Sequence, residues 1–290
     1  MSTFIIFGAT GATGRFLLPA LRARGERIHA VSRRAAPVGD AAQATWIHGD
    51  LFATIGPLPP AADVIVSLGP LDAFAAWFAD NPVPGVRRVI ALSSMSAESK
   101  RASADAGERE LSQRLRSAEQ SLLDAANVRG IAGTILRPTL IYGGGPDRSL
   151  VPIVRLALRW RVLPMPLGAS GLRQPVHAAD LAAAVIAVVD CAAAHGRIYA
   201  LGGGERLRFD RMLWRLRAAM PGFVLPLPFP RALAAVLLRL RVRAAAGEIG
   251  VAAVHRLGTD LIADNDEAMR DFGYSPRAFS AVDVVAAALS

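Results

Sequence analysis

The sequence predicts an α/β fold: a doubly wound parallel sheet followed by a small C-terminal lobe. Three observations support this prediction. Short apolar runs alternate with helical patterns through the first half of the 290-residue chain, which is typical of a parallel sheet with helices on both faces. A glycine-rich turn directly follows the first apolar run. Glycine and proline become frequent from Pro138 to Pro146, where we expect the second lobe to begin.

Each element of the first half is predicted by its own pattern. Buried parallel strands are short apolar runs bounded by turn residues, whereas helices repeat apolar residues at helical spacing. The expected strands are Thr3–Phe7, Ile28–Val31, Thr45–His48, Asp63–Ser67, Arg88–Leu92 and Gly130–Leu136. The expected helices are Ala12–Arg24, Leu71–Ala79 and Asp105–Ala126.

The second half is predicted to be mixed. Its expected helices are Val151–Trp160, Ala178–Asp190, Phe209–Ala219, Arg231–Arg243 and Asp264–Phe272, with one strand at Arg197–Leu201. Pro221–Pro230 contains four prolines and is expected to be an extended connector. We therefore predict one domain over residues 1–145, completed by parts of 170–202, and a lobe formed mainly by residues 146–290.

Residues 8–14 read Gly-Ala-Thr-Gly-Ala-Thr-Gly between an expected strand and an expected helix. Gly8 permits the tight turn, Gly11 lets the backbone approach a pyrophosphate, and Gly14 lets the helix pack closely on the strand. The first amide groups of the helix are available to an anion. The turn therefore predicts a dinucleotide site, and its expected residues are Gly8, Thr10, Gly11, Ala12, Thr13 and Gly14.

The residues after the second strand predict which dinucleotide binds. Ser32, Arg33 and Arg34 follow this strand, and no acid occurs between Ala30 and Gly39. An acid there would bind the ribose hydroxyls of NAD, whereas guanidinium groups match the 2′-phosphate of NADP in charge and geometry. We therefore expect NADP(H) to be preferred over NAD(H). Two solvated surface arginines are the alternative interpretation.

Seven short motifs occur along nearly the whole chain in a fixed order. They are Gly8–Gly14, Gly49–Leu51, Leu92–Ser94, Arg137–Pro138, Ile141–Gly143, Gln174–Ala182 and Asp264–Pro276. In this order the chain resembles the extended and atypical branches of the short-chain dehydrogenase/reductase family, including NAD-dependent epimerases and dehydratases. The resemblance implies a Rossmann fold with a substrate-binding lobe and a nicotinamide cofactor.

The resemblance adds further expected cofactor-binding residues. Asp50 and Leu51 would lie on the adenine side of the cofactor. The remaining candidates lie at the ends of strands, and they are Ser67, Leu68, Gly69, Ser93 and Pro138.

One part of the family pattern is missing. The family's catalytic Tyr and Lys lie four residues apart on the helix after the fifth strand, and these places fall here on Leu111 and Leu115. Hydrocarbon cannot donate a proton to a substrate carbonyl. Either another residue supplies the acid, or the chain no longer carries out hydride chemistry.

Two residues are the catalytic candidates. Ser94 matches the family's catalytic Ser/Thr, with a hydroxyl that bonds nearby backbone as the alternative. Tyr142 follows the Arg-Pro motif, and its phenol could donate a proton or simply pack. Other possible replacements for the acid are Lys100 (the only lysine), His177 and Asp180. A solvated loop lysine and an ordinary helix start explain these three without catalysis.

Composition excludes several kinds of site. The single Cys191 excludes an internal disulfide and a cysteine-cluster metal site, and the five histidines lack metal-ligand spacing, so we expect no metal. The net charge is +9, with +3 in residues 1–150 and +6 in residues 151–290. A basic lobe suits an anionic small-molecule substrate, whereas no nucleic-acid-binding signature is present.

Localisation is predicted from two further observations. No basic-then-apolar leader precedes the first strand, and no apolar stretch is long enough to span a membrane, so we expect a cytoplasmic protein. Arg231–Arg243 is amphipathic, which suits a membrane surface or a partner. A lobe helix that packs its leucines is the favoured interpretation.

Two classes of function remain open. The first is an NADP(H)-dependent oxidoreductase or an epimerase/dehydratase-type enzyme without the Tyr-Lys pair, with a nucleotide sugar as one conceivable substrate. The second is a non-enzymatic nucleotide-binding regulator or accessory subunit, similar to NmrA-like proteins or the nucleotide-binding accessory subunit of respiratory complex I. The sequence identifies neither the substrate nor the oligomeric state.

Overall fold

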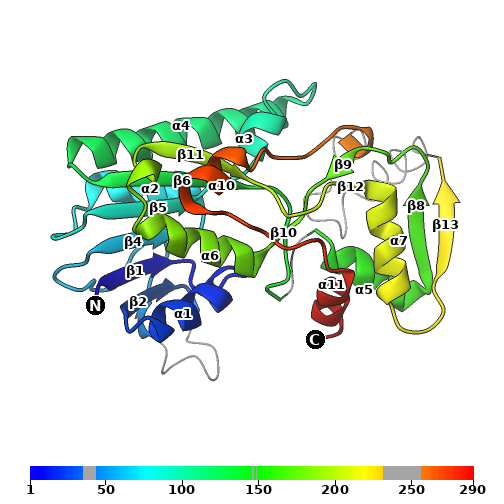
Figure 1. Cartoon of the computed structure of the whole chain (residues 1–290), viewed down its shortest axis with the longest axis horizontal. Helices are drawn as coiled ribbons and strands as arrows, with labels where there is room; N and C mark the ends of the chain where they lie inside the picture. Colours follow the sequence, from blue (N-terminus) through cyan, green and yellow to red (C-terminus); the bar gives the residue numbers. More distant parts are fainter. Residues whose placement is uncertain (35–43, 146, 148, 231–255) are drawn as a thin grey trace.

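The computed structural model describes residues 1–34, 44–145, 147, 149–230 and 256–290. Its centre is a seven-stranded parallel sheet in the order β11-β6-β5-β4-β1-β2-β3 (Figure 1). The strands are β1 (Thr3–Phe7), β2 (Arg27–Ser32), β3 (Thr45–His48), β4 (Val64–Ser67), β5 (Arg88–Leu92), β6 (Ala132–Pro138) and β11 (Arg197–Leu201). This order confirms the predicted doubly wound α/β fold.

Helices cover both faces of the sheet. Helices α1 (Gly14–Ala23), α6 (Ala178–Val189) and α10 (Asp266–Phe272) lie on one face, and α2 (Leu71–Asp80) and α4 (Ala106–Val128) lie on the other. Side chains of one strand alternate between the two faces. Accordingly, Phe4 and Ile6 belong to the core beneath α1 and α6, whereas Ile5 and Phe7 belong to the core beneath α2 and α4.

Among the described residues, the second lobe contains three helices of eight or more residues that share a core of their own. These helices are α5 (Val151–Trp160), α7 (Phe209–Ala219) and α11 (Ala281–Leu289). Two parallel strands, β8 (Val162–Pro166) and β13 (Leu225–Phe229), close the far end of this lobe (Figure 1). Short two-residue strands lie between the lobes and along their border, and they are β7 (Ile141–Tyr142), β9 (Leu172–Arg173), β10 (Val176–His177) and β12 (Leu207–Arg208).

The structure corrects one predicted element. Pro221–Pro230, expected to be a connector, contains strand β13. Prolines normally argue against a strand because they lack the N–H donor. Here Leu225 N–H donates to Arg161 O at 2.8 Å, and Phe229 O accepts from Leu167 N–H at 2.9 Å. The backbone N–H and C=O groups of every second residue, Leu225, Leu227 and Phe229, therefore face β8. Pro226 and Pro228 therefore place their nitrogens on the open edge, where no donor is needed.

Some predictions fall outside what the structure can test. The predicted helix Arg231–Arg243 lies outside the described residues. In the described part of the chain, no helix is both long enough and apolar enough to cross a membrane.

Candidate cofactor groove and reaction site

The glycine turn after β1 is required partly by the fold and partly by space for a ligand. Gly8 has φ +75°, and a Cβ there would lie 3.0 Å from the backbone nitrogen of Gly69. A Cβ at Gly14 would lie 2.0 Å from Ala9 O. Gly11 differs, because its φ is not positive and an added Cβ would meet only Gly8 O, at 3.1 Å. Gly8 and Gly14 therefore serve close packing, whereas Gly11 leaves room above the turn.

The first turn of α1 is open to an anion. Its N-cap, Thr13, makes no side-chain cap hydrogen bond, and the turn contains no acidic residue. Uncapped amide groups and the helix dipole favour a negatively charged group at this position. This is the feature that a pyrophosphate requires.

A groove of about 620 Å³ runs across the carboxyl ends of β1 to β4. Such crevices are where open parallel sheets bind their ligands. Many of the predicted cofactor residues line it, namely Gly8, Thr10, Gly11, Ala12, Ser32, Arg33, Arg34, Asp50, Leu51, Leu68 and Gly69. The other five predicted residues, Thr13, Gly14, Ser67, Ser93 and Pro138, are not part of its lining.

Hydrogen bonds fix the walls of the groove. Ser32 is buried, and its hydroxyl accepts from Arg34 N–H at 3.0 Å, which orders the start of the arginine pair. Asp50 accepts from Phe52 N–H at 3.1 Å. Ser67 Oγ is buried and has no protein partner in the described part of the chain. The glycine cradle and the uncapped helix fit a bound dinucleotide, whereas the Ser67 hydroxyl is fully buried beneath the groove and does not line it.

Seven lining residues were missed by the sequence prediction, namely Phe7, Arg15, Val31, Gly49, Phe52, Pro70 and Gly144, and two of them matter most for the site. Arg15, exposed in the first turn of α1, adds a positive charge beside the anion position. A cation one residue after the glycine turn was a signal that could have indicated it. Gly144 lines the groove from the loop after β7, and a Cβ there would lie 2.5 Å from Ala12 Cα. No local pattern predicts a contact between segments so far apart.

The reaction end of the site presents hydrocarbon where the family resemblance implies Tyr and Lys. Leu111 and Leu115 lie on α4, and both are half-buried. Ser94, at the end of β5, accepts from Ser96 N–H at 3.1 Å. Helix α4 is anchored nearby, because Ser112 Oγ donates to Ala97 O at 2.6 Å. The described residues thus supply a hydroxyl at this end and no Tyr-Lys pair.

A buried ionic cluster lies beneath this end of the sheet. Glu119 of α4 is 1% exposed and accepts from Arg137 of β6, with a 2.8 Å bond from Nε and a second from Nη2. Arg137 also bonds Glu98 at 2.8 Å, and Ser93 Oγ donates to Glu119. The hydrogen bond with Glu119 is the main cause that raises the pKa of Arg137. The cluster joins α4 to the ends of β5 and β6.

Tyr142 occupies a structural position. Its side chain is fully buried, and its hydroxyl accepts from Ser280 N–H at 3.0 Å and lies 3.3 Å from Ala278 O. The ring packs edge-on against His177 and Phe279. Burial raises the pKa of the Tyr142 phenol. This geometry counts against the predicted catalytic role, because the hydroxyl is held within the lobe and does not line the groove.

The other candidate acids also have partners inside the protein. Lys100 Nζ lies 3.5 Å from Glu108, near the start of α4. His177 Nδ1 accepts from Ala179 N–H at 3.1 Å and so caps α6. Asp180 accepts from Arg277, through the backbone N–H at 3.0 Å and Nε at 2.9 Å.

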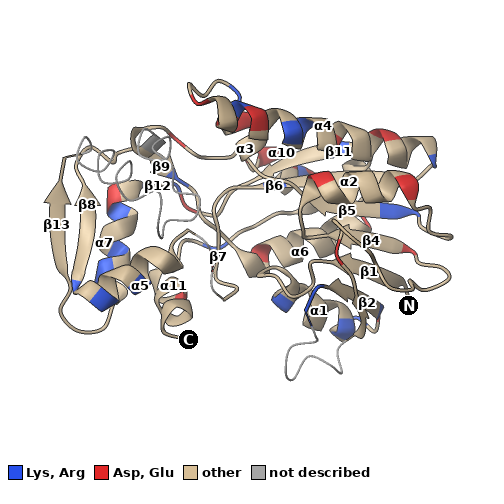
Figure 2. Ribbon diagram, turned by 180° about the vertical axis from the view of Figure 1, so that it is seen from behind, with Lys and Arg blue, Asp and Glu red and all other residues tan. Residues whose placement is uncertain are grey.

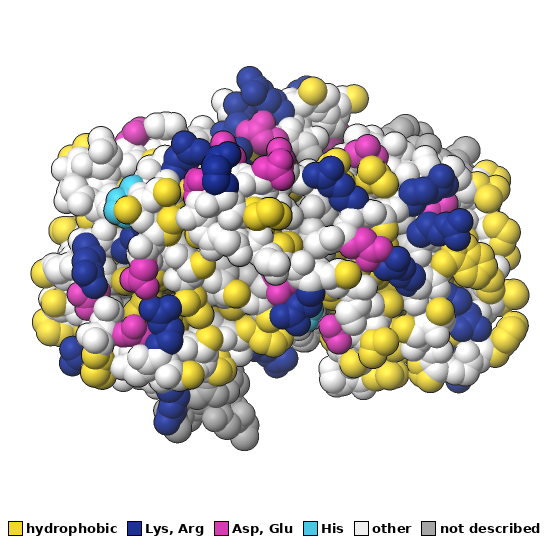
Figure 3. All heavy atoms as spheres, in the orientation of Figure 1, with side chains coloured by type: hydrophobic (Ala, Val, Ile, Leu, Met, Phe, Trp, Pro, Cys, Tyr) yellow, Lys and Arg dark blue, Asp and Glu magenta, His cyan; other side chains and the backbone are white. Residues whose placement is uncertain are grey.

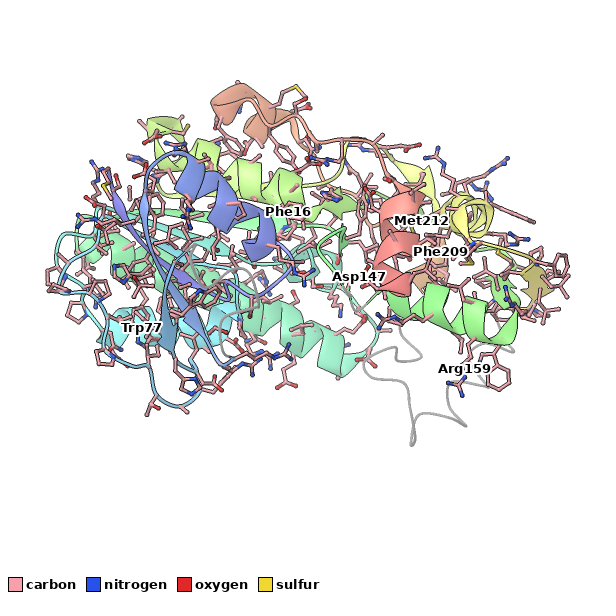
Figure 4. The ribbon with its side chains drawn as sticks, turned by 90° about the horizontal axis from the view of Figure 1, so that it is seen from below. Phe16, Trp77, Asp147, Arg159, Phe209 and Met212 are labelled. Carbon is pink, nitrogen blue, oxygen red and sulfur yellow. The ribbon has the colours of Figure 1, made fainter. Side chains whose placement is uncertain are left out.

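The electrostatics of His177 agree with this capping role. Burial is the main cause that lowers its pKa, and the positive charge of Arg277 contributes. His177 also packs against Phe16 of α1, with ring centroids 5.4 Å apart. Figure 4 shows Phe16 on α1 and Asp147 before α5, on opposite sides of the border between the lobes.

Among the described residues, no group of His, Cys, Asp or Glu could hold a metal ion.

Comparisons with known proteins give a fold and no sequence relative. No family model and no curated protein matches the chain. Among solved structures, UDP-glucuronic acid 4-epimerase from Bacillus cereus in complex with UDP-glucuronic acid and NAD has a TM-score of 0.69 at 14% identity, covering 98% of this chain and 97% of that one. MoeE5 in complex with UDP-glucuronic acid and NAD has a TM-score of 0.69 at 17% identity, covering 97% and 96%.

A third neighbour is a different enzyme. The dTDP-glucose 4,6-dehydratase from Bacillus anthracis str. Ames in complex with NAD has a TM-score of 0.70 at 11% identity, covering 100% of this chain and 96% of that one. The likeness extends over both lobes and is consistent with the resemblance read from the motifs. The chain therefore has the Rossmann-type α/β fold shared by NAD-dependent epimerases and dehydratases.

Proposed function

We propose that this chain is an NADP(H)-binding protein that acts as an oxidoreductase or epimerase/dehydratase-type enzyme without a Tyr-Lys pair. The observation that carries the proposal is the groove itself. The groove is lined by the glycine turn, by the uncapped N-terminus of α1 and by Ser32, Arg33 and Arg34. A bound nicotinamide would supply or accept a hydride.

The preference for NADP(H) is the finer part of the proposal. The solved neighbours named above hold NAD. In this chain Arg33 and Arg34 line the groove at the end of β2, where the ribose is recognised. A 2′-phosphate beside two guanidinium groups forms charge-assisted hydrogen bonds that the 2′-hydroxyl of NADH cannot match.

The substrate class is proposed from the neighbours and from charge. The solved neighbours include structures with UDP-glucuronic acid and with UDP-glucose. Residues 151–290 of this chain carry 17 basic and 11 acidic residues, which favours an anionic ligand. We propose a nucleotide sugar, with Ser94 as the hydroxyl that hydrogen-bonds the reacting oxygen.

The second candidate function is a nucleotide-binding regulator or accessory subunit without catalysis. Leu111 and Leu115 favour it, because they replace the groups that transfer a proton in the related enzymes. Tight NADPH binding with no turnover would support this candidate.

Calorimetry with NADPH and NADH tests the proposal. We expect NADPH to bind more tightly to the natural sequence. Replacing both Arg33 and Arg34 by Ala should weaken NADPH binding by about tenfold or more for each charge-assisted hydrogen bond removed, and leave NADH binding unchanged. Arg27→Ala is the matched control, since it removes a charge from the opposite, exposed end of the same strand. Equal affinities of the natural protein for the two cofactors would contradict the preference.

Activity is tested separately with a panel of nucleotide sugars. NADPH absorbance follows any net oxidation or reduction, and chromatography of the sugars detects epimerisation or dehydration, which leave the cofactor in its starting state. If a substrate is found, Ser94→Ala should lower kcat. An unchanged kcat in that variant would contradict the role given to Ser94, without bearing on cofactor binding.

A further inference from the structure

The far end of the second lobe exposes an unusual amount of hydrocarbon. Among the described residues, thirteen large hydrophobic side chains are exposed, and seven of them lie between Leu156 and Leu227. Figure 3 shows hydrophobic side chains gathered at the right-hand end of the molecule, with basic side chains among them. Contiguous apolar surface of this kind marks a contact site.

The core of this surface is the outer face of the β8–β13 pair. Two residues that pair across the strands point to the same face of the sheet, and every second pair points to the same side. On the outer face these pairs are apolar on both strands: Leu225 with Val162, Leu227 with Pro164, and Phe229 with Pro166. The alternate pairs, which include the buried Leu163 and Met165, face the lobe core. Leu225 and Leu227 are 45% and 49% exposed, so these two side chains of the outer face are accessible among the residues that the structure describes.

Two aromatic residues extend this face at one end. Because the strands are parallel, the residues two positions before each strand lie at the same end of the pair. These residues are Trp160 and Phe223, which are 63% and 71% exposed. We call Trp160, Phe223, Leu225 and Leu227 the apolar tip.

Three arginines lie close to the apolar tip. Arg217 Nε donates to Val224 O, within the segment that leads into β13. A Cβ at Gly222 would lie 3.1 Å from a guanidinium nitrogen of Arg161, which places that charge beside Phe223 in the chain. Arg159 projects from the end of α5 away from the body of the protein (Figure 4). Basic segments on α5 and α7 lie beside β8 and β13 in Figure 2.

Positive charge predominates around this surface, although Arg215 is paired with Glu205. Residues 151–167 and 209–229 together contain six arginines and a single acid, Asp210. Asp210 is already bonded to Arg208, at 2.7 and 3.1 Å. Exposed aromatic and aliphatic side chains beside arginines are typical of proteins that rest on anionic lipid headgroups.

The same features disfavour a second copy of the chain as the occupant. In a two-fold contact, each patch meets itself, so arginines would face arginines. The open edge of β13 cannot add a strand either, since Pro226 and Pro228 leave it without donors at those positions. We propose that the apolar tip and its arginines form a peripheral docking site for an anionic phospholipid membrane.

Vesicle flotation with the full chain tests this proposal. The probes are vesicles of phosphatidylcholine alone and of phosphatidylcholine mixed with phosphatidylglycerol. We expect the protein to float with the anionic vesicles only, and binding to weaken as salt is raised. Replacing Arg159 by Gln and Arg161 by Asn should lower the apparent affinity by about fivefold for each charge removed. Arg161 has φ 55°, a conformation that asparagine tolerates.

The apolar part is tested with Trp160→Ser and Leu225→Ser together, which should abolish flotation. Val128→Ser is the matched control, because Val128 is 86% exposed on the distant α4 and its replacement should change nothing. Circular dichroism and the melting temperature verify that each variant is folded.

Several outcomes would overturn the proposal. These are equal binding to neutral vesicles, no binding to either kind, or full binding by the Trp160→Ser, Leu225→Ser variant. Sedimentation velocity adds a further check, since a self-association that the apolar-tip variants abolish would assign the surface to a second copy instead.

Discussion

The two ends of the cofactor site are built in different ways. At the phosphate and ribose end, the backbone turn of Gly8–Gly14 and the side chains after β2 leave unpaired groups facing a groove. At the reaction end, Leu111 and Leu115 present hydrocarbon, and the polar groups nearby are bonded to one another. The groove thus has features that suit a dinucleotide, whereas Leu111 and Leu115 offer no proton donor on α4.

The largest expected effect lies at the reaction end and concerns stability. Glu119→Gln should lower the free energy of unfolding by about 3 kcal/mol, because it leaves the half-buried Arg137 without its main partner. Glu98→Gln, at the exposed arm of the same cluster, should cost less than about 1 kcal/mol. Urea unfolding measures both. Equal costs would mean that the cluster does not fasten α4 to the sheet.

The second-largest expected effect concerns nucleotide binding at the glycine turn. Gly11→Val should weaken nucleotide binding by about 100-fold or more, since a branched side chain occupies the space above the turn. The melting temperature should fall less than in Gly14→Ala, because an added Cβ meets a single backbone atom, Gly8 O, at 3.1 Å. Gly14→Ala is the contrasting variant. Its Cβ would lie 2.0 Å from Ala9 O, so it should destabilise the fold itself by about 3 kcal/mol. Unchanged affinity in Gly11→Val would show that these glycines serve the turn alone.

A smaller expected effect distinguishes a structural role of Tyr142 from a catalytic one. Tyr142→Phe removes the acceptor of the Ser280 N–H and should lower stability by about 1 kcal/mol. It should leave any measured turnover unchanged, whereas Ser94→Ala should reduce it. Thermal unfolding and steady-state kinetics on the two variants make the comparison. A fall in kcat for Tyr142→Phe at full stability would restore the catalytic role read from the sequence.

The smallest effect is a pH dependence at the border between the lobes. The pKa of His177 is lowered in the folded protein, so the unfolded chain binds more protons as the pH falls. The contribution of His177 to stability is complete above the unfolded pKa of about 6.5 and declines below it. His177→Asn keeps a capping oxygen and removes the titration. Its melting temperature should fall less than that of the natural protein between pH 7.5 and 5.5, and an identical fall would assign the dependence to other groups.

Much of the sheet could be predicted from local patterns. The strands Thr3–Phe7, Thr45–His48 and Arg88–Leu92 have the predicted bounds, because each is a short apolar run between turn residues. Strand β13 was missed because its prolines suppress the local signal, and only its pairing with β8 explains why they are tolerated. Helix α11 was not predicted at all.

The candidate site, like the fold, could be predicted only in part. The groove residues after β1 and β2 belong to contiguous motifs that a sequence displays directly. The contact of Gly144 with Ala12 and the bond of Tyr142 to Ser280 join segments more than 100 residues apart, and no periodicity encodes such pairs. Tyr142 therefore resembled an acid near the cleft, although its hydroxyl is held by backbone groups of the lobe.

The close approach of Gly144 to the glycine turn has a mechanical consequence. A Cβ at Gly144 would lie 2.5 Å from Ala12 Cα, so the loop after β7 and the phosphate turn are in contact with no room for a side chain between them. Neither segment can therefore move toward the other. A nucleotide that immobilises the turn would therefore also restrain the polypeptide that leads into the second lobe. A nucleotide bound at the turn would act on the lobe through this steric contact, and Gly145 of the same loop packs against the Arg15 guanidinium beside it.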